Sequence, residues 1–193
     1  MDAALELFRS SGYQKTMIID ITKKAGAAKG TFYHYYPSKE AIVQAICSRW
    51  GTQIAASFKL EGSHLDALPK LELFIERLFL PKEPNTLFKR LWDEEHLNLY
   101  YKSWKTLVED IFNPLLIEII QQGNEEGTMH VVCQQQAISF FWNILSCVWE
   151  AILFQDTPDV FASKAKMAIS LLERILGIEE GKFEISLTSY GIA

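Results

Sequence analysis

The sequence is poor in residues that interrupt helices and in residues that cross-link a chain. Its 193 residues include six prolines and ten glycines, and this scarcity favours long helices over a sandwich of many turns. Three cysteines, Cys47, Cys133 and Cys147, form no CxxC pair. Their odd number and spacing predict reduced, buried thiols rather than a disulfide framework.

The sequence also lacks a long uninterrupted apolar run. The most apolar stretch, residues 140–154, contains Asn143, Ser146 and Glu150, and is too short and too polar to span a bilayer. The first residues show no basic segment followed by an apolar one, as a secretory signal would. We therefore expect a cytoplasmic protein with no membrane partner.

Motifs of catalysis and of phosphate or metal binding are missing too. The chain contains no GxxxxGK, no GxSxG and no HExxH, and no set of His, Cys or acidic residues has the spacing of a metal site. We predict no catalytic residues, no cofactor and no metal. An enzyme on an all-α scaffold stays as an alternative, which would need a cluster of titratable residues that the sequence does not reveal.

Charge is present but unevenly distributed. The formal net charge is −5, yet residues 1–50 carry +3 and the remainder carries −8. A basic N-terminal part on an acidic body is the asymmetry expected when only one end of a protein meets a polyanion. The charge difference is modest, so sequence motifs must decide whether the N-terminal part binds a polyanion.

The N-terminal residues predict short helices joined by a tight turn. Residues 2–11 form the first, and Gly12 is a plausible stop. Thr16 is expected to cap the second helix, with its hydroxyl on the free amides of the first turn. A third helix over 28–35 follows the glycine-containing turn and ends before Pro37.

Ser38 is expected to cap a longer helix that follows the third. Two short helices, a turn with Ala25 and Gly26, and a capped long helix are the pattern of a helix-turn-helix. From about residue 61 the apolar spacing changes to longer amphipathic segments, and no stretch alternates with period two. Helices are expected near residues 67–80, 86–94, 96–122, 134–155 and 159–177, with a kink at Asn113–Pro114.

The last two expected helices carry broad apolar stripes. Two such helices can pack together and leave apolar surface for a second copy, which would make a four-helix homodimer interface. Periodicity reports burial and not the partner, so the chain's own core is an equal alternative for these residues. The predicted interface comprises Phe141, Leu145, Val148, Ile152, Ala165, Ile169 and Leu172.

The segment "TMIIDITKKAGAAKGTFYHYYPSKEAIVQAI", residues 16–46, closely resembles the DNA-binding head of the TetR family of transcriptional regulators. The shared features include Asp20–Ile21, the turn at Ala25–Gly26, the run from Lys29 to Tyr33, and Pro37 to Glu40. The resemblance implies an all-α fold of about nine helices. A three-helix head, residues 1–45, would bind DNA, and residues 46–193 would form a helical ligand-binding and dimerisation domain.

In a helix-turn-helix the recognition helix lies in the major groove, and its first residues are nearest the bases. Lysine, threonine, tyrosine and histidine side chains there can meet phosphates or base edges, and Gly30 lets the backbone approach closely. Lys39 is expected to add an anion site at the start of the next helix. The predicted DNA contacts are Thr16, Ala28, Lys29, Gly30, Thr31, Tyr33, His34 and Lys39.

The resemblance further implies a homodimeric repressor that a small apolar or aromatic effector releases from a palindromic operator in double-stranded DNA. The body is rich in aromatic residues, and some carry a polar atom suited to a pocket; core packing is the ordinary alternative for each. The predicted effector-binding residues are Trp92, His96, Tyr100, Trp104 and Trp149. A second interpretation is a helical small-molecule-binding module without specific DNA binding, which the absence of a hydroxyl at Ala28 favours.

Overall fold

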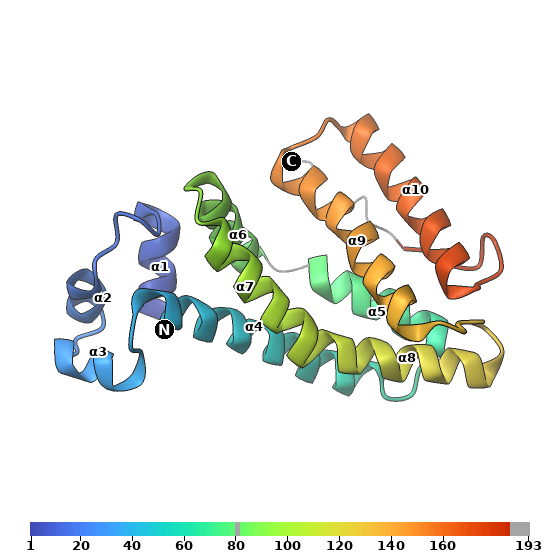
Figure 1. The fold of residues 1–193 in the computed structure, drawn as a ribbon, viewed down its shortest axis with the longest axis horizontal. Coiled ribbons are helices and arrows are strands. Elements are labelled where there is room, and N and C mark those ends of the chain that lie inside the picture. The colour runs from blue at the N-terminus through green and yellow to red at the C-terminus, as the bar shows by residue number, and fades with distance from the viewer. Residues whose placement is uncertain (80–81, 186–193) are drawn as a thin grey trace. The chain divides into compact units, whose positions relative to one another are not determined.

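The computed structural model describes residues 1–79 and 82–185, and the regular structure in these ranges is helical throughout. The elements follow one another along the chain as Figure 1 shows. They are α1 (Asp2–Ser11), α2 (Ile18–Lys24), α3 (Lys29–Tyr35), α4 (Lys39–Gly62), α5 (Ala67–Phe79), α6 (Lys82–Asp93), α7 (Leu97–Leu107), the π-helical turn η1 (Val108–Phe112), α8 (Asn113–Glu126), α9 (Gln134–Leu153) and α10 (Pro158–Leu176).

The expected all-α class is confirmed. When α7, η1 and α8 are counted as one interrupted helix, the described residues contain nine helices, as predicted. The interruption lies where the sequence predicts a kink, since α8 begins at Asn113 with Pro114 in its first turn. Proline is tolerated there because the first amides of a helix have no partner within the helix.

Contacts divide the described chain into two compact units. The first comprises residues 1–53 and 82–111, and the second comprises residues 54–79 and 112–185. Helix α4 begins in the first unit and ends in the second. The functional boundary expected between residues 45 and 46 stays a prediction, because packing units and functional regions need not coincide.

Local signals define the helices of the N-terminal head. Helix α1 ends at Ser11, directly before Gly12. Helix α3 starts at Lys29, one residue later than expected, and Pro37 follows its end. The Ser38 hydroxyl accepts a hydrogen bond from the Ala41 amide at 3.2 Å, which confirms the predicted cap of α4.

The core of the second unit is aromatic. Phe74 of α5 is fully buried, and its ring lies 6.1 Å from Phe112, 6.5 Å from Phe141 and 6.2 Å from Trp142, measured between ring centres. The Trp142 indole donates to Asn113 Oδ1 at 2.7 Å, so the polar atom of this ring is satisfied inside the core.

Helix α9 is longer than the apolar stretch recognised in the sequence. Among the described residues it is the one helix whose length and composition would suit a membrane span, and half of its most apolar window is buried within the protein. It packs along α10 and buries residues such as Ala137, Phe141 and Leu145. Such burial requires the same apolar composition, so the composition alone does not indicate a membrane.

The cysteines differ in their surroundings. Cys47 is buried, and burial raises the pKa of its thiol to about 12. Cys133 and Cys147 are exposed, so the prediction of buried thiols is wrong for these two. Cys133 directly precedes α9, and Cys147 lies on the outer face of that helix.

Candidate nucleic-acid interface

The loop between α1 and α2, residues 12–17, is held by side chains from α4, and we refer to it as the anchored loop. The Lys39 ammonium donates to the carbonyl oxygens of Tyr13 at 2.7 Å and Thr16 at 3.1 Å. The same ammonium lies 4.2 Å from the centre of the Tyr13 ring. The Tyr13 hydroxyl donates to Glu40 Oε1 at 2.8 Å. The first turn of α4 therefore fixes the loop through both of its charged residues.

The anchored loop shifts the pKa of the groups that hold it. Burial lowers the pKa of the Lys39 ammonium. Burial also raises the pKa of the Tyr13 hydroxyl, and its bond to Glu40 adds to the rise. The pKa of Glu40 lies below its ordinary value, because the Ser38 hydroxyl, its own backbone amide and then Tyr13 donate to it. Lys39 thus supports the loop, whereas the sequence predicted an anion site at this ammonium.

Thr16 also points into the protein rather than toward a partner. It is 2% exposed, and its hydroxyl donates to the Gly12 carbonyl at 2.6 Å. The position that caps α2 is Met17, whose amide donates to Asp20 Oδ2 at 3.1 Å. The predicted capping role of Thr16 is therefore wrong. An acidic side chain in the first turn of α2 closes that helix end instead.

Helix α6 contacts the anchored loop from another side. Gly12 has φ 87° and ψ 158°, a region that is almost restricted to glycine. A Cβ built on Gly12 would lie 2.2 Å from Glu94 Oε1. The Glu94 carboxylate also accepts from the Gln14 amide at 2.7 Å, and the Arg90 guanidinium donates to the Arg9 carbonyl at 3.2 Å. Glu94, directly after α6, thus bonds the loop, and Arg90 of α6 bonds α1, all within the first unit.

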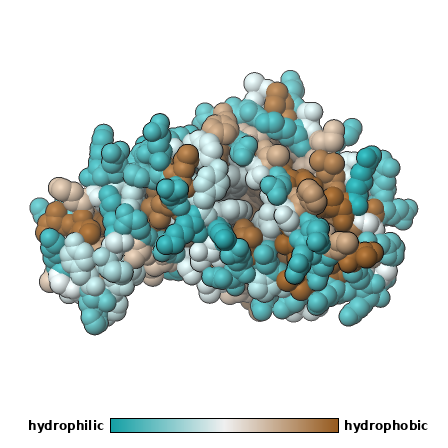
Figure 2. Space-filling model, viewed as in Figure 1, coloured by the Kyte–Doolittle hydropathy of each residue, from teal (hydrophilic) through white to brown (hydrophobic). Residues whose placement is uncertain are grey.

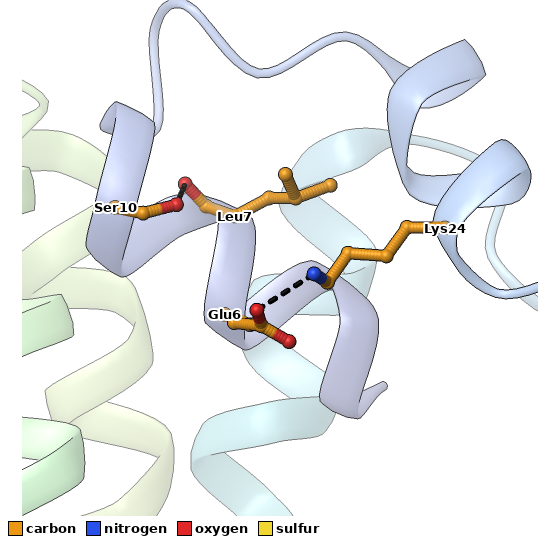
Figure 3. A network of polar contacts seen from close by, with 4 residues as sticks. All are labelled: Glu6, Leu7, Ser10 and Lys24. Carbon is orange, nitrogen blue, oxygen red and sulfur yellow. Dashed lines mark hydrogen bonds and ion pairs between the residues drawn. The ribbon is translucent and has the colours of Figure 1, made fainter.

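An ion pair joins the first two helices of the head. Figure 3 shows the Lys24 ammonium of α2 directed at the Glu6 carboxylate of α1, and their atoms are 2.6 Å apart. Beside it, the Ser10 hydroxyl donates to the Leu7 carbonyl at 3.5 Å. The charge of Lys24 is therefore partly neutralised within the head, although both partners remain at the surface.

A second region of the head is turned outward throughout. Every residue from 23 to 31, which we name the exposed tip, is exposed to solvent. It covers the end of α2, the turn, and the first residues of α3. Ala28 occupies the N-cap position of α3 without a side-chain hydrogen bond. The predicted contacts Lys29, Gly30 and Thr31 all lie in this tip.

Helix α3 has one buried side. Phe32 is 6% exposed and packs 5.7 Å from Tyr36, between ring centres. Gly30 and His34 are each two positions from Phe32, so the helical period places them on the opposite side. Tyr33, 46% exposed, is adjacent to them. The structure therefore brings Gly30, Tyr33 and His34 to one outward surface.

Nothing in residues 1–79 and 82–185 requires a glycine at position 30. Its φ is not positive, and a Cβ built on it would meet no atom within 4 Å. A glycine inside a helix costs about 0.5–1 kcal/mol relative to alanine. The cost has no compensation inside the described protein, which is the pattern expected where an outside partner approaches the backbone closely.

Between α2 and α3 lies an open groove of about 390 Å³. Two apolar side chains that the sequence analysis did not select flank it: Met17 is 60% exposed and Ile19 is 52% exposed. Figure 2 shows the corresponding apolar surface over α2. Ile19 falls off the stripe of Ile18, Ile21 and Thr22, so its spacing could have revealed its exposure. The groove is lined by Gln14, Thr16, Met17, Ile18, Ile19, Lys29, Tyr33 and Lys39.

The head that carries this surface matches a known family of proteins. The profile of bacterial regulatory proteins of the tetR family matches residues 1–46, the segment that contains the anchored loop and the exposed tip. Residues 1–46 are thus a head of the tetR type. The model that they match describes bacterial regulatory proteins.

Individual relatives agree with the match. It is 39% identical over 85 residues to the HTH-type transcriptional regulator YvdT of Bacillus subtilis, and the alignment covers 43% of each chain. The chain thus matches less than half the length of this relative. The fold resembles the transcriptional regulator FadR of Bacillus subtilis, solved with stearoyl-CoA, with TM-score 0.68, 21% identity and coverage of 92% and 97%. A regulator from Saccharomonospora viridis, solved with choline, gives TM-score 0.67, 16% identity and coverage of 93% and 95%.

Four of the five predicted effector-binding residues lie in the first unit. Trp92, Tyr100 and Trp104 belong to an aromatic group around Phe88: the Phe88 ring is 5.4 Å from Tyr100 and 6.1 Å from Trp104, and Trp92 is 5.6 Å from Tyr100. Trp149 lies in the second unit, with its ring 6.0 Å from that of Phe79.

His96 has different surroundings from these aromatic residues. Its ring packs edge-on to Tyr13 at 4.7 Å, and its buried Nε2 has no hydrogen-bond partner in the described structure. It also lines a cavity of about 350 Å³ in the first unit, together with Tyr13, Glu40, Gln44, Glu95, Leu97, Asn98, Leu99 and Lys102. His96 therefore faces the anchored loop and polar groups.

The predicted dimer residues are largely buried within the chain itself. Phe141, Leu145, Val148, Ala165 and Leu172 are each at most 5% exposed. Ile152 and Ile169 are half-buried. Phe141 packs on Phe74 of α5, and α9 packs along α10, so the chain itself accounts for much of this burial, and the interface role of these residues stays a prediction. Periodicity identified their burial but not the partner that buries them.

The exposed sides of the same two helices carry other apolar residues. Phe140 is 60% exposed, Met167 is 61% exposed and Leu171 is 39% exposed. Figure 2 shows apolar surface over these helices. No group of three or more metal-ligating side chains occurs in the residues that the structure describes.

Proposed function

We propose that the protein is a cytoplasmic, homodimeric transcriptional repressor that binds a palindromic operator and leaves it when a small apolar or aromatic effector binds. Two heads would contact major-groove faces about 34–36 Å apart, or a multiple of that distance. The observation that carries the proposal is Gly30, a helical glycine on the outward surface for which the chain has no internal use.

In the proposed complex the exposed tip enters the major groove. Lys29 and Thr31 reach phosphates or base edges, with Tyr33 and His34 one turn further along α3. The backbone at Ala28 and Gly30 approaches the duplex. Thr16 and Lys39 contribute indirectly, because their hydrogen bonds hold the anchored loop and the start of α4 in place.

The first experiment selects bound duplexes from a random pool and measures the affinity of the selected duplex over a salt series. A palindromic sequence with a steep salt dependence supports the proposal. Binding no tighter than to competitor DNA at low salt contradicts it.

The Gly30→Ala variant tests the role proposed for Gly30, because the stability of the fold and the affinity for the operator should change in opposite directions. Alanine should stabilise the fold by about 0.5–1 kcal/mol and weaken operator binding by excluding the close approach. Thermal unfolding and fluorescence anisotropy measure the two effects. Lys23→Ala, at an exposed position of α2, is the control for a general change of the head surface. Unchanged operator affinity in Gly30→Ala would refute this role for the backbone.

The homodimer is proposed to form through the outer face of α9 and α10, where Phe140, Met167 and Leu171 are exposed. Met167→Glu should shift the protein toward monomer in light scattering, since a charge would be buried at an apolar contact. Ala162→Glu adds the same charge at an exposed position on another side of α10 and should leave the dimer intact. Equal behaviour of the two variants would place the interface elsewhere.

The effector is proposed to bind at the aromatic residues of α6 and α7, which include Trp92, Tyr100 and Trp104. The stearoyl-CoA and choline of the two neighbours differ in chemistry, so the fold supports an effector site without selecting its ligand. The effector must bind the DNA-incompetent state more tightly, otherwise it shifts no equilibrium. Screening compounds for release of the labelled operator tests this, with Trp104→Leu expected to reduce the response and retain DNA binding.

One observation favours the alternative of a small-molecule-binding module without specific DNA binding. Ala28 offers no side-chain cap to α3, and the Lys39 ammonium is already bonded to the loop. The alternative predicts that no sequence is enriched from the random pool while small ligands still raise the melting temperature.

A further inference from the structure

The outward surface of α3 carries an unusual selection of side chains for reading bases. Between Ala25 and Tyr36 the sequence contains no Arg, Asn, Gln, Asp or Glu. These are the side chains that make paired hydrogen bonds to guanine or adenine, or accept from cytosine. Lys29 is the one residue of this segment suited to a guanine edge. Discrimination among bases must therefore depend largely on other contacts.

Thr31 is placed for such a contact. It is exposed and directly follows Gly30, the outward position at which no Cβ blocks an approaching duplex. Its hydroxyl and its methyl group are both on the surface of α3, whereas the other threonines of the head, Thr16 and Thr22, are buried and hydrogen-bonded to backbone carbonyls. A threonine methyl group packs favourably on the C5-methyl group of thymine.

Exposed apolar side chains lie close to the exposed tip, which itself carries Lys23, Lys24 and Lys29. Met17 and Ile19 are exposed beside the groove between α2 and α3, and Figure 2 shows apolar surface there. The Lys29 ammonium lies 5.9 Å from the centre of the Tyr33 ring, toward that groove. Lys29 is thus oriented along the groove wall and leaves Thr31 beside Gly30 on the outward side.

We infer that Thr31 is a specificity-determining residue, whose methyl group contacts the C5-methyl group of a thymine in each operator half-site. This inference rests on the proposed function and deepens it: one thymine in each half-site is recognised through its methyl group and not through a hydrogen bond.

The test replaces thymines of the selected duplex by deoxyuridine, one position at a time in both half-sites, and measures affinity by anisotropy. Deoxyuridine keeps the hydrogen-bonding edge and removes only the methyl group. At the contacted position each half-site should lose about fourfold in affinity, the value of one buried methyl group. Thymines outside the protected half-sites serve as the internal control and should show no change.

Two matched variants separate the methyl group of Thr31 from its hydroxyl. Thr31→Ser keeps the hydroxyl and should abolish the difference between thymine and deoxyuridine at that position. Thr31→Val keeps a methyl group and should preserve the difference, even if overall affinity falls through a lost phosphate contact. When the Thr31 variants and the deoxyuridine replacements are combined in a double-mutant cycle, we expect an interaction free energy at one base position and at no other.

Three results would contradict the inference. Equal affinity for thymine and deoxyuridine at every half-site position overturns it while the proposed function stands. A difference that persists unchanged in Thr31→Ser assigns the methyl contact to another residue. If no duplex is enriched, the proposed function fails and this inference fails with it.

Discussion

The anchored loop and the exposed tip contain the same three kinds of residue, yet they use them in opposite ways. Gly12 is required by its backbone angles, whereas Gly30 has ordinary helical geometry and open space around it. Thr16 is buried with its hydroxyl bonded to Gly12, whereas Thr31 is exposed.

Two lysines complete the comparison. Lys39, which holds the loop from α4, donates to three loop carbonyls at 2.7–3.4 Å, and Lys29 is exposed in the tip. Residue type alone therefore does not mark a DNA contact. What distinguishes the two regions is whether the chain itself already satisfies the group, and this difference can be tested by the same substitution at each member of a pair.

The largest expected difference is between the two glycines. Gly12→Ala should lower the free energy of unfolding by about 1–3 kcal/mol, because alanine is strained in that backbone region. The new Cβ must also displace the Glu94 carboxylate from the loop. Gly30→Ala should change stability in the opposite direction. Urea unfolding of both variants measures the difference, and a loss of stability in both would remove the contrast.

The threonines should differ next. Thr16→Val removes the donor to the Gly12 carbonyl at a buried site and should cost about 1–2 kcal/mol. Thr31→Val is exposed and should change stability by less than about 0.5 kcal/mol. Thermal unfolding distinguishes them. Equal costs would mean that the hydroxyl of Thr16 contributes nothing beyond its volume.

The lysines should separate stability from DNA affinity. Lys39→Met keeps the apolar stem, loses the bonds to Tyr13 and Thr16, and should cost about 1 kcal/mol. Lys29→Met should leave stability unchanged, weaken DNA binding and lower the slope of log affinity against log salt by about 1. Measuring the operator affinity of both variants over a salt series distinguishes the two roles. A reduced slope in Lys39→Met with unchanged stability would restore Lys39 as a direct phosphate contact.

The smallest effect is the pH dependence that Glu40 adds. Its pKa is lowered in the folded protein by donors from Ser38, its own backbone amide and Tyr13. Its contribution is therefore present above the unfolded pKa, about 4.3, and is lost as the pH falls through the folded pKa. The urea midpoint of Glu40→Gln should fall less steeply than that of the unaltered protein between about pH 5 and pH 3. Parallel curves would show that these bonds do not stabilise the fold.

Much of the fold could be predicted because helix ends are set by local chemistry. Gly12, Ser38 and Pro114 each act within one turn of their own position, and the helices begin or end beside them. The direction of a side chain is not local. Lys39 turns inward because carbonyls from a loop 23 residues earlier face it. The residues near Lys39 in the sequence do not predict that contact.

The apolar residues of α9 and α10 show the same limit of prediction from sequence. Phe141 and Leu145 were expected at an interface because they are apolar at helical spacing, and they are buried against the chain's own helices. Phe140 and Met167 are exposed although Phe140 directly precedes Phe141 in the same apolar stretch, so apolar character alone does not separate exposed from buried positions. A stripe and its exposed neighbours can be told apart only when the packing of α9 on α10 is known.

The hydrogen bonds of Arg90 in α6, and of Glu94 directly after it, have a consequence for any regulation of this protein. Glu94 and Arg90 hold backbone atoms of the loop and of α1, so a ligand that displaces α6 also changes the free energy of the head's binding conformation. Thermodynamic linkage makes that relation reciprocal. An operator bound by the head must change the affinity of such a ligand by the same factor by which the ligand changes the affinity of the operator.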